Sequence, residues 1–273
     1  MRIADALVRQ GTARDREDML FVPANGEGIY GVADGVSEPC SPTTGGPRRD
    51  AQGTTGGQHI VTTLARKILF PQPGKNLEQI LLEANSELRQ LEGWVDDAGL
   101  IPGASLALAE VSKNAVFVIT AGDAFAVWQT KTGFVGATPN PTFHYELLNR
   151  HNLATCLAES GGDTGKAWDL HLPFAKKHAR EHKNVDFAEF NGQGAFLGLC
   201  TRTLLDPREL QRLVVFTDGM VKFEWTEHPN LLAQRIMHEF EDGMLREVLV
   251  AAHGWKNAHN GKHPEATAIA LEF

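Results

Sequence analysis

The chain has 273 residues, of which 42% are hydrophobic and 22% are charged, a composition typical of a globular protein that is neither disordered nor fibrous. Its 34 acidic and 26 basic residues give a formal net charge of −8, which argues against a nucleic-acid partner because such binding needs a basic surface. No apolar run approaches the roughly 18 residues of a membrane span, and the first residues lack the apolar stretch of a signal peptide. We therefore expect no membrane association and a cytoplasmic location.

The first part of the chain predicts two short strands followed by a long loop. Residues 20–22 and 28–33 have the pattern of strands, and Asn25-Gly26 between them is a dipeptide suited to a hairpin turn. Residues 36–58 contain three prolines and five glycines, which interrupt regular structure. Long loops in compact domains are often functional, so this segment is expected to lie near a site.

Two helices and three strands are expected next. A helix is predicted over residues 58–68, and a second begins at Asn76, where Asn76 and Gln79 have the spacing of a capping box. The strands are predicted at residues 105–110, 114–121 and 124–129. Their close spacing favours antiparallel pairing.

The second half of the chain is harder to interpret. Residues 139–200 show little periodicity, apart from a helical pattern over 143–158. A strand at 212–217, helices at 229–241 and 244–253 and a final strand at 266–273 follow. Pairs of helices between groups of antiparallel strands indicate an α+β fold, in which two sheets pack face to face with helices outside. We expect a single domain over residues 1–273.

Acidic residues recur at the predicted strand ends. Glu17 and Asp18 precede the first strand, Asp34 ends the second, Asp123 lies between two strands, and Asp218 follows the late strand. Oxygen ligands without cysteine suit Mg²⁺ or Mn²⁺. An Asp-Gly pair alone is more often an ordinary turn, but the five acidic residues together predict a metal site.

Six segments in this order resemble the metal-dependent, or type 2C, protein serine/threonine phosphatases. They are residues 14–18 (RDRED), 30–36 (YGVADGV), 103–107 (GASLA), 118–124 (VITAGDA), 215–220 (VFTDGM) and 265–269 (EATAI). The resemblance spans nearly the whole chain, and it is the order and spacing of the six segments that make it specific. It implies a sandwich of two antiparallel sheets flanked by paired helices, in agreement with the fold expected above.

The resemblance also implies a two-metal mechanism. Asp34 would bridge two Mg²⁺ or Mn²⁺ ions, the Gly35 carbonyl would bind one of them, and Asp218 would hold the other. Glu17 and Asp18 would complete the coordination shells, and Asp123 would bind a third ion. In that family, paired cations activate water for attack on phosphoserine or phosphothreonine of a phosphoprotein. Oligomeric state is not predicted.

Three departures from the family pattern bear on the assignment. The phosphate-binding arginine of the family aligns with Ala13, so Arg14 is the candidate in its place. The last metal-binding aspartate aligns with Pro264, so Glu265 is the candidate ligand. The Gly-Gly-His sequence that follows the first Asp-Gly is absent, and His59 is the nearest histidine after the loop.

Two alternatives stay open, the first because of these departures and the second because of a separate motif. The first is a catalytically degenerate phosphatase-fold module that acts by binding a partner. The second is a zinc site, because residues 178–182 (HAREH) spell an inverted zinc-protease motif. Lysines surround that motif without an apolar stripe, so it is interpreted as a solvated charged segment. Arg48 and Arg49 in the long loop are either contacts for an anionic phosphopeptide or part of a solvated turn.

Overall fold

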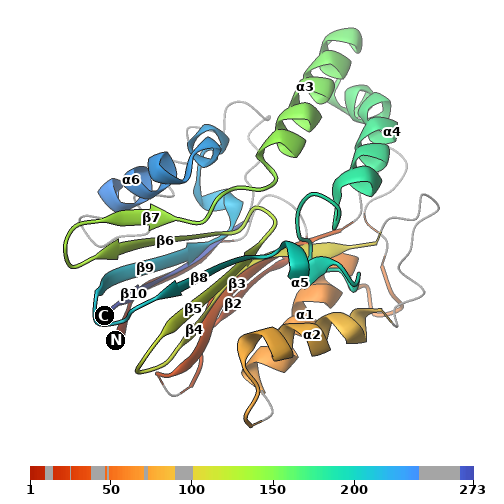
Figure 1. Ribbon diagram of the computed structural model, residues 1–273. Coiled ribbons are helices and arrows are strands. Elements are labelled where there is room, and N and C mark those ends of the chain that lie inside the picture. The colour runs from red at the N-terminus through yellow and green to blue at the C-terminus, as the bar shows by residue number, and fades with distance from the viewer. Residues whose placement is uncertain are drawn as a thin grey trace.

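Two antiparallel sheets lie face to face in the computed structural model, which describes residues 1–9, 15–24, 26–37, 47, 49–70, 73–89, 101–239 and 265–273 (Figure 1). One sheet has the strand order β1-β10-β9-β6-β7 and the other the order β2-β3-β4-β5-β8. The strands are β1 (Arg2–Arg9), β2 (Asp18–Phe21), β3 (Gly28–Val36), β4 (Gly103–Val111), β5 (Val116–Ala121), β6 (Phe125–Thr130), β7 (Val135–Ala137), β8 (Thr201–Leu205), β9 (Leu210–Phe216) and β10 (Ala266–Glu272).

Helices cover both outer faces of this sandwich. They are α1 (Gly56–Leu69), α2 (Leu77–Leu88), α3 (Phe143–Glu159), α4 (Thr164–His182), α5 (Phe196–Leu199), α6 (Pro229–Glu239) and the 3-10 helices η2 (Asp218–Met220) and η3 (Phe223–Glu227). Helices α1 and α2 lie on the β2-β3-β4-β5-β8 sheet, and α6 lies on the other sheet (Figure 1). The result is the four-layer α+β sandwich expected from the sequence.

Side-chain alternation along the strands explains the layers. In β3, Ala33 packs in the core beneath α1 and α2, whereas its neighbour Val32 packs in the core between the sheets. In β4, Leu106 and Leu108 face the helices and Ala107 faces the other sheet. Successive side chains of a strand point to opposite faces, so a strand buried on both faces is apolar throughout. This double burial fixes the register of the strands that carry the site.

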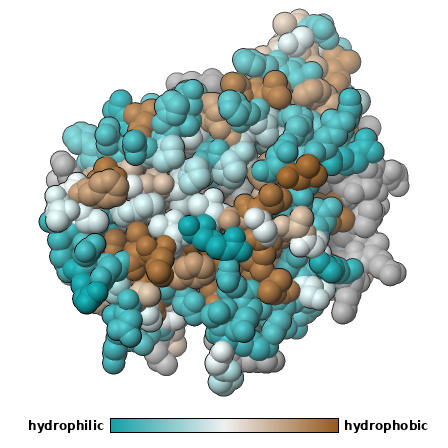
Figure 2. Space-filling model, in the orientation of Figure 1, coloured by the Kyte–Doolittle hydropathy of each residue, from teal (hydrophilic) through white to brown (hydrophobic). Residues whose placement is uncertain are grey.

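Helices α3 and α4 form a hairpin that projects from one end of the sandwich (Figure 1). The two helices pack mainly against each other. Their surface mixes hydrophilic and hydrophobic residues (Figure 2), and Leu148, Leu157 and Leu170 are among the exposed apolar side chains. The predicted helix at 143–158 is confirmed by α3, but α4 was not predicted.

Most other predicted elements are also confirmed. The capping box of α2 forms as expected, because Asn76 accepts a hydrogen bond from the Gln79 backbone and the Gln79 side chain accepts one from the Asn76 backbone. Strands β1, β7 and β8 were missed; β1 and β8 carry alternating exposed residues at sheet edges, and β7 has only three residues. The helix predicted at 244–253 and Asn25 of the predicted turn lie outside the described residues.

Within the described ranges, the model contains no helix with the length and apolar character that crossing a bilayer requires.

Candidate active site

Register pairing brings three of the predicted acidic residues to one end of the β2-β3-β4-β5-β8 sheet. Asp18 of β2 is paired with Asp34 of β3, and Asp34 is paired in turn with Ser105 of β4. The Ser105 hydroxyl donates to Asp123 Oδ1 at 2.6 Å, across the turn between β5 and β6. The antiparallel ladder therefore lines up Asp18, Asp34 and Asp123 across neighbouring strands.

The β1-β10-β9-β6-β7 sheet contributes Asp218 and Glu265 at the same end. Asp218 directly follows Thr217, whose hydroxyl donates to Asp18 Oδ2 at 3.0 Å. The Thr217 backbone amide donates to the Thr267 carbonyl at 2.9 Å, which joins the ends of β9 and β10. We call the resulting group the carboxylate rim; its members are Glu17, Asp18, Asp34, Asp123, Asp218 and Glu265.

Glu265 anchors the segment that carries two of these residues. Its Oε2 accepts hydrogen bonds from the backbone amides of Glu17 and Asp18, both at 2.7 Å. A carboxylate that accepts two backbone amides holds them strongly, because charge-assisted hydrogen bonds are about twice as strong as neutral ones. Glu265 thus lies at the rim as expected, with one oxygen committed to positioning Glu17 and Asp18.

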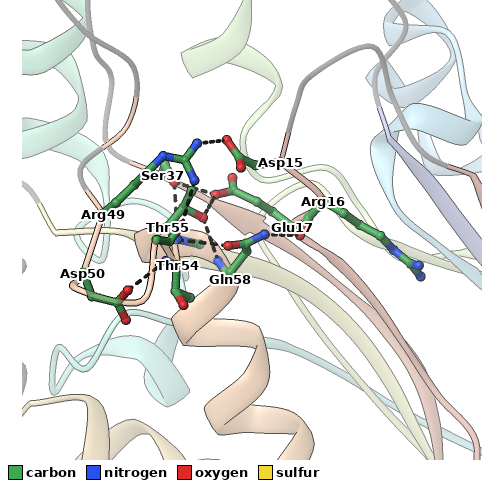
Figure 3. Close-up of polar contacts among 11 residues, drawn as sticks. Asp15, Arg16, Glu17, Ser37, Arg49, Asp50, Thr54, Thr55 and Gln58 are labelled. Atoms are coloured by element: carbon green, nitrogen blue, oxygen red, sulfur yellow. Dashed lines mark hydrogen bonds and ion pairs between the residues drawn. The ribbon is translucent and has the colours of Figure 1, made fainter.

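Glu17 lies at the N-terminus of α1 (Figure 3). Its Oε1 accepts hydrogen bonds from the hydroxyls of Ser37, at 2.6 Å, and of Thr55. Thr55 is also the N-cap residue of α1, where its side chain accepts from the Gln58 amide. The partial positive charge of a helix N-terminus favours an anion there. The polar contacts around α1 therefore fix the Glu17 carboxylate.

The two Asp-Gly pairs require glycine for close packing. A Cβ on Gly35 would lie 2.7 Å from the Gly57 carbonyl oxygen, and a Cβ on Gly219 would lie 1.7 Å from the Glu265 carbonyl oxygen. Any side chain would push these segments apart. Glycine at both positions therefore brings Asp34 close to α1 and Asp218 close to the start of β10.

The predicted arginines have different outcomes. Arg49 forms an ion pair with Asp15 and donates to the Gly53 carbonyl at 2.8 Å, so its guanidinium ties the loop to the segment before Glu17 (Figure 3). Arg14 and Arg48 lie outside the described residues. The structure therefore leaves the phosphate-binding role of Arg14 a prediction.

Burial and mutual repulsion raise the pKa values of the rim carboxyls. Burial raises the pKa of Asp18 to about 6, and the negative charge of Glu265 adds to this effect. Burial also raises the pKa of Asp34 well above its usual range, and the charges of Asp18 and Asp218 reinforce it. The pKa of Asp218 is raised in the same direction by burial and by Asp123. The rim thus holds more negative charge than its protein surroundings compensate.

Two observations bear on whether this group fits a divalent cation. Asp18 Oδ1 is buried and has no hydrogen-bond partner among the described residues, which is costly unless a cation binds it. Within the same residues, however, no three His, Cys, Asp or Glu side chains are arranged so that they could hold an ion. The donor chemistry and the excess charge fit Mg²⁺ or Mn²⁺, although the described carboxylates do not form a closed ligand set without the ion.

A pocket of about 490 Å³, counted with its open mouth, adjoins the rim. Asp123 and Asp218 line it, as do Glu146 and Arg150 of α3. The pKa of Glu146 is raised to about 7, mainly by burial and also by the charge of Asp123, while the charge of Arg150 opposes the rise. The sequence analysis missed Glu146 and Arg150, because only their spacing of four residues on one helix face marks them, and many helices share it.

No model of a protein family matches the sequence, and no curated protein sequence matches it. Solved structures do match. The catalytic domain of the serine/threonine protein phosphatase PstP, in complex with two manganese ions, gives a TM-score of 0.55 at 18% identity, over 97% of this chain and 96% of that one. The protein has the fold of these phosphatases.

Two further phosphatases support that statement. The serine/threonine phosphatase PstP/Ppp of Mycobacterium tuberculosis gives a TM-score of 0.55 at 17% identity and covers 98% of both chains. Stp1 of Staphylococcus aureus gives 0.55 at 14% identity, over 100% of this chain and 96% of that one. The resemblance to type 2C phosphatases is therefore confirmed at the level of the fold. The two Asp-Gly sequences, one near the end of β3 and one shortly after β9, lie at the same rim of this fold.

The histidine motif at 178–182 is not the solvated segment that was predicted. His178 on α4 is buried, its ring stacks on Tyr145 with centroids 4.5 Å apart, and its Nε2 is 3.3 Å from the Tyr145 carbonyl oxygen. His182 lies beside it with centroids 4.3 Å apart. The prediction was wrong about His178 because its ring packs against Tyr145 of α3 as well as against Phe174, four residues earlier on α4. These contacts pack the hairpin, and among the described residues they form no metal site.

Proposed function

We propose that this protein is a metal-dependent phosphatase that hydrolyses phosphoserine or phosphothreonine in proteins. The observation that carries the proposal is the carboxylate rim, where strands of both sheets end in acidic residues. The fold is similar to that of PstP with two manganese ions. We also propose that Glu17, Asp18, Gly35, Asp34, Asp123, Asp218 and Glu265 are the metal-binding set, as the resemblance implies.

The rim supports a cation by charge as well as by position. Asp18, Asp34 and Asp218 each have a raised pKa, which means that their ionised forms lack compensation in the protein alone. A divalent cation would supply that compensation and draw the oxygens together. When bound, paired Mg²⁺ or Mn²⁺ ions would activate water and neutralise phosphate oxygens.

The residues of this chain would position that chemistry. Thr217 orients Asp18 through its hydroxyl, and Ser105 orients Asp123. Glu265 and Thr55 hold the Glu17-Asp18 segment from both sides. Such supporting contacts keep ligands in place, and their loss typically costs about ten- to a hundredfold in metal affinity or activity. Cytoplasmic location and the choice between manganese and magnesium stay predictions.

Hydrolysis of p-nitrophenyl phosphate and a phosphothreonine peptide tests the proposal. Purified protein is assayed with Mn²⁺, with Mg²⁺ and with chelator, beside Asp218→Asn and the control Asp206→Asn. Asp206 lies in the turn between β8 and β9. The turn follows Leu205, which pairs with Val116 at the end of β5 that lies away from the rim. We expect metal-dependent turnover that Asp218→Asn abolishes and Asp206→Asn retains.

The absence of turnover with either metal, in folded protein, would reject this function. It would favour the alternative of a degenerate phosphatase-fold module that binds a partner. Equal activity of Asp218→Asn and the control would instead reject the site assignment.

A further inference from the structure

The pocket beside the rim is lined by two rim aspartates and by Glu146 and Arg150 of the projecting hairpin. Asp123 and Asp218 come from the two sheets, and Arg150 comes from α3. Of the residues that line this pocket in the described part of the chain, Arg150 alone is cationic. The pocket therefore combines the proposed metal-binding carboxylates with a positive group that they do not supply.

Arg150 is held in the pocket by an aromatic platform. Its guanidinium carbon lies 4.1 Å from the centroid of the Phe223 ring. Phe143, seven residues before Arg150 on α3, stacks on the same ring with centroids 4.7 Å apart and an interplanar angle of 6°. A guanidinium over a ring uses its flat face for that contact, while its N–H donors lie in its plane.

The platform is itself supported by polar contacts. The Asn140 side-chain amide donates to the Thr226 hydroxyl at 2.9 Å, and that hydroxyl donates to the Phe223 carbonyl at 2.7 Å. Asn140 and Thr226 also line the pocket. Groups held in place before binding lose little entropy when they bind, which favours recognition of a small anion.

We propose that Arg150 binds a phosphoryl oxygen of the substrate in this pocket. The inference rests on the proposed function. A guanidinium suits a phosphate because its fork of donors matches two phosphate oxygens. Arg150 comes from α3 rather than from the N-terminal segment in which the sequence analysis placed the phosphate-binding arginine.

The charges of the pocket agree with this role. Arg150 lowers the pKa of both Glu146 and Asp218, which places its charge close to each. Glu146, four residues before Arg150 on α3, repels an anion when it is ionised, as the rim carboxylates do, so phosphate is expected to bind when cations occupy the rim.

The test compares Arg150→Gln and Arg150→Lys with the control Arg180→Gln, an exposed arginine on α4 of the same hairpin. Two readouts are needed: kcat and KM with Mn²⁺ for p-nitrophenyl phosphate and a phosphothreonine peptide, and calorimetric binding of inorganic phosphate with Mn²⁺ and with chelator. Circular dichroism checks the fold of each variant, and Arg150→Lys keeps the charge where Arg150→Gln does not.

We expect Arg150→Gln to lower kcat/KM about ten- to a hundredfold for both substrates and to weaken phosphate binding with Mn²⁺ by a similar factor, as loss of a charged hydrogen bond predicts. Arg150→Lys should recover part of each loss, and Arg180→Gln should match wild type. Unchanged phosphate binding in Arg150→Gln would overturn the inference. A loss confined to the peptide would also overturn it, since Arg150 would then contact the peptide.

Failure of the proposed function is distinguishable from failure of this inference. Wild-type protein without turnover would reject the phosphatase assignment, but the phosphate titration would still decide the role of Arg150. Phosphate binding that depends on Arg150 would support it, and wild-type protein that binds no phosphate would overturn it.

Discussion

The carboxylate rim and the α3–α4 hairpin border the same pocket but are built differently. The rim residues Asp18 and Asp34 lie on paired strands whose positions are fixed by ladder hydrogen bonds and by burial on both faces. The hairpin is held mainly by contacts between its own two helices, including the stacked rings of Tyr145 and His178. The rim is thus a rigid arrangement of charge, and the hairpin is a separable wall that brings Arg150 to it.

This difference suggests a division of roles. A metal site needs ligands fixed by the surrounding fold, which strands of two packed sheets provide. Substrate contacts tolerate more variation, and binding residues are often carried on segments outside the core. Changes at the rim should therefore act on metal binding and on the chemical step, whereas changes in the hairpin should act on substrate binding.

The largest effect is expected for Asp34→Asn. Asp34 is central to the rim, and its pKa is raised by burial and by three neighbouring aspartates. Its replacement should lower metal-dependent kcat by about 10²- to 10³-fold or more, the range for loss of one electrostatic group in an active site. Steady-state kinetics with Mn²⁺ measure this. Asp206→Asn is the matched control, and equal activities would refute the role of Asp34.

Proton linkage at Asp18 gives the next largest effect. Its pKa rises from 3.8 in the unfolded chain to about 6 in the metal-free fold, so the folded state binds the proton more tightly. The associated stability is fully present below about pH 4 and is lost as the pH rises through about 6, a change of about 3 kcal/mol.

Thermal unfolding in chelator at a series of pH values measures this linkage. Asp18→Asn should flatten the decline between about pH 4 and pH 6. Mn²⁺ should raise Tm more at about pH 7.5 than at about pH 5, because protons and the metal compete for the same carboxylates. A decline over this interval that is equally steep in wild type and in Asp18→Asn would contradict the account.

A smaller effect separates the rim from an ordinary helix cap. Thr55 and Asn76 are N-caps of α1 and α2, and both form capping boxes, but only Thr55 also donates to Glu17. Thr55→Ala and Asn76→Ala should each lower the free energy of unfolding by about 1 kcal/mol. Thr55→Ala alone should weaken Mn²⁺ binding, by about tenfold or more. Equal Mn²⁺ affinities would show that the Glu17 contact is irrelevant to the metal.

The smallest effect concerns the hairpin itself. Amide hydrogen exchange should be faster in α3 and α4 than in the central strand β4, because elements with few contacts to the core open at lower free energy. Mass spectrometry of exchanged peptides measures the difference. Protection of α4 equal to that of β4 would mean that the hairpin is not a separable wall.

Strand ends explain why so much of the rim could be predicted. Asp34 and Asp218 follow apolar runs and precede glycines, and the close approaches at Gly35 and Gly219 show what those glycines are for. The placement of Glu265 against two backbone amides was not predictable, because the residues that donate these amides lie 248 and 247 positions earlier in the chain.

The second helix of the hairpin, α4, escaped prediction for a related reason. His178 stacks on Phe174, four residues earlier on α4, and on Tyr145 of α3, and only the first of these contacts follows a spacing within α4. The contact of Arg150 with Phe223 of η3 likewise joins two separate elements and is not visible in the sequence. Pairs of residues from distant elements leave no local pattern in the sequence, whereas apolar strands followed by Asp-Gly do.

Manganese binding tests the central claim most directly. Calorimetric titration of metal-free wild type, Asp34→Asn and Asp206→Asn with Mn²⁺ measures affinity and stoichiometry without any substrate. The account predicts saturable binding of two ions per chain in wild type and in Asp206→Asn, with loss of at least one ion in Asp34→Asn. Absence of saturable binding in folded wild-type protein, or full binding by Asp34→Asn, would contradict it.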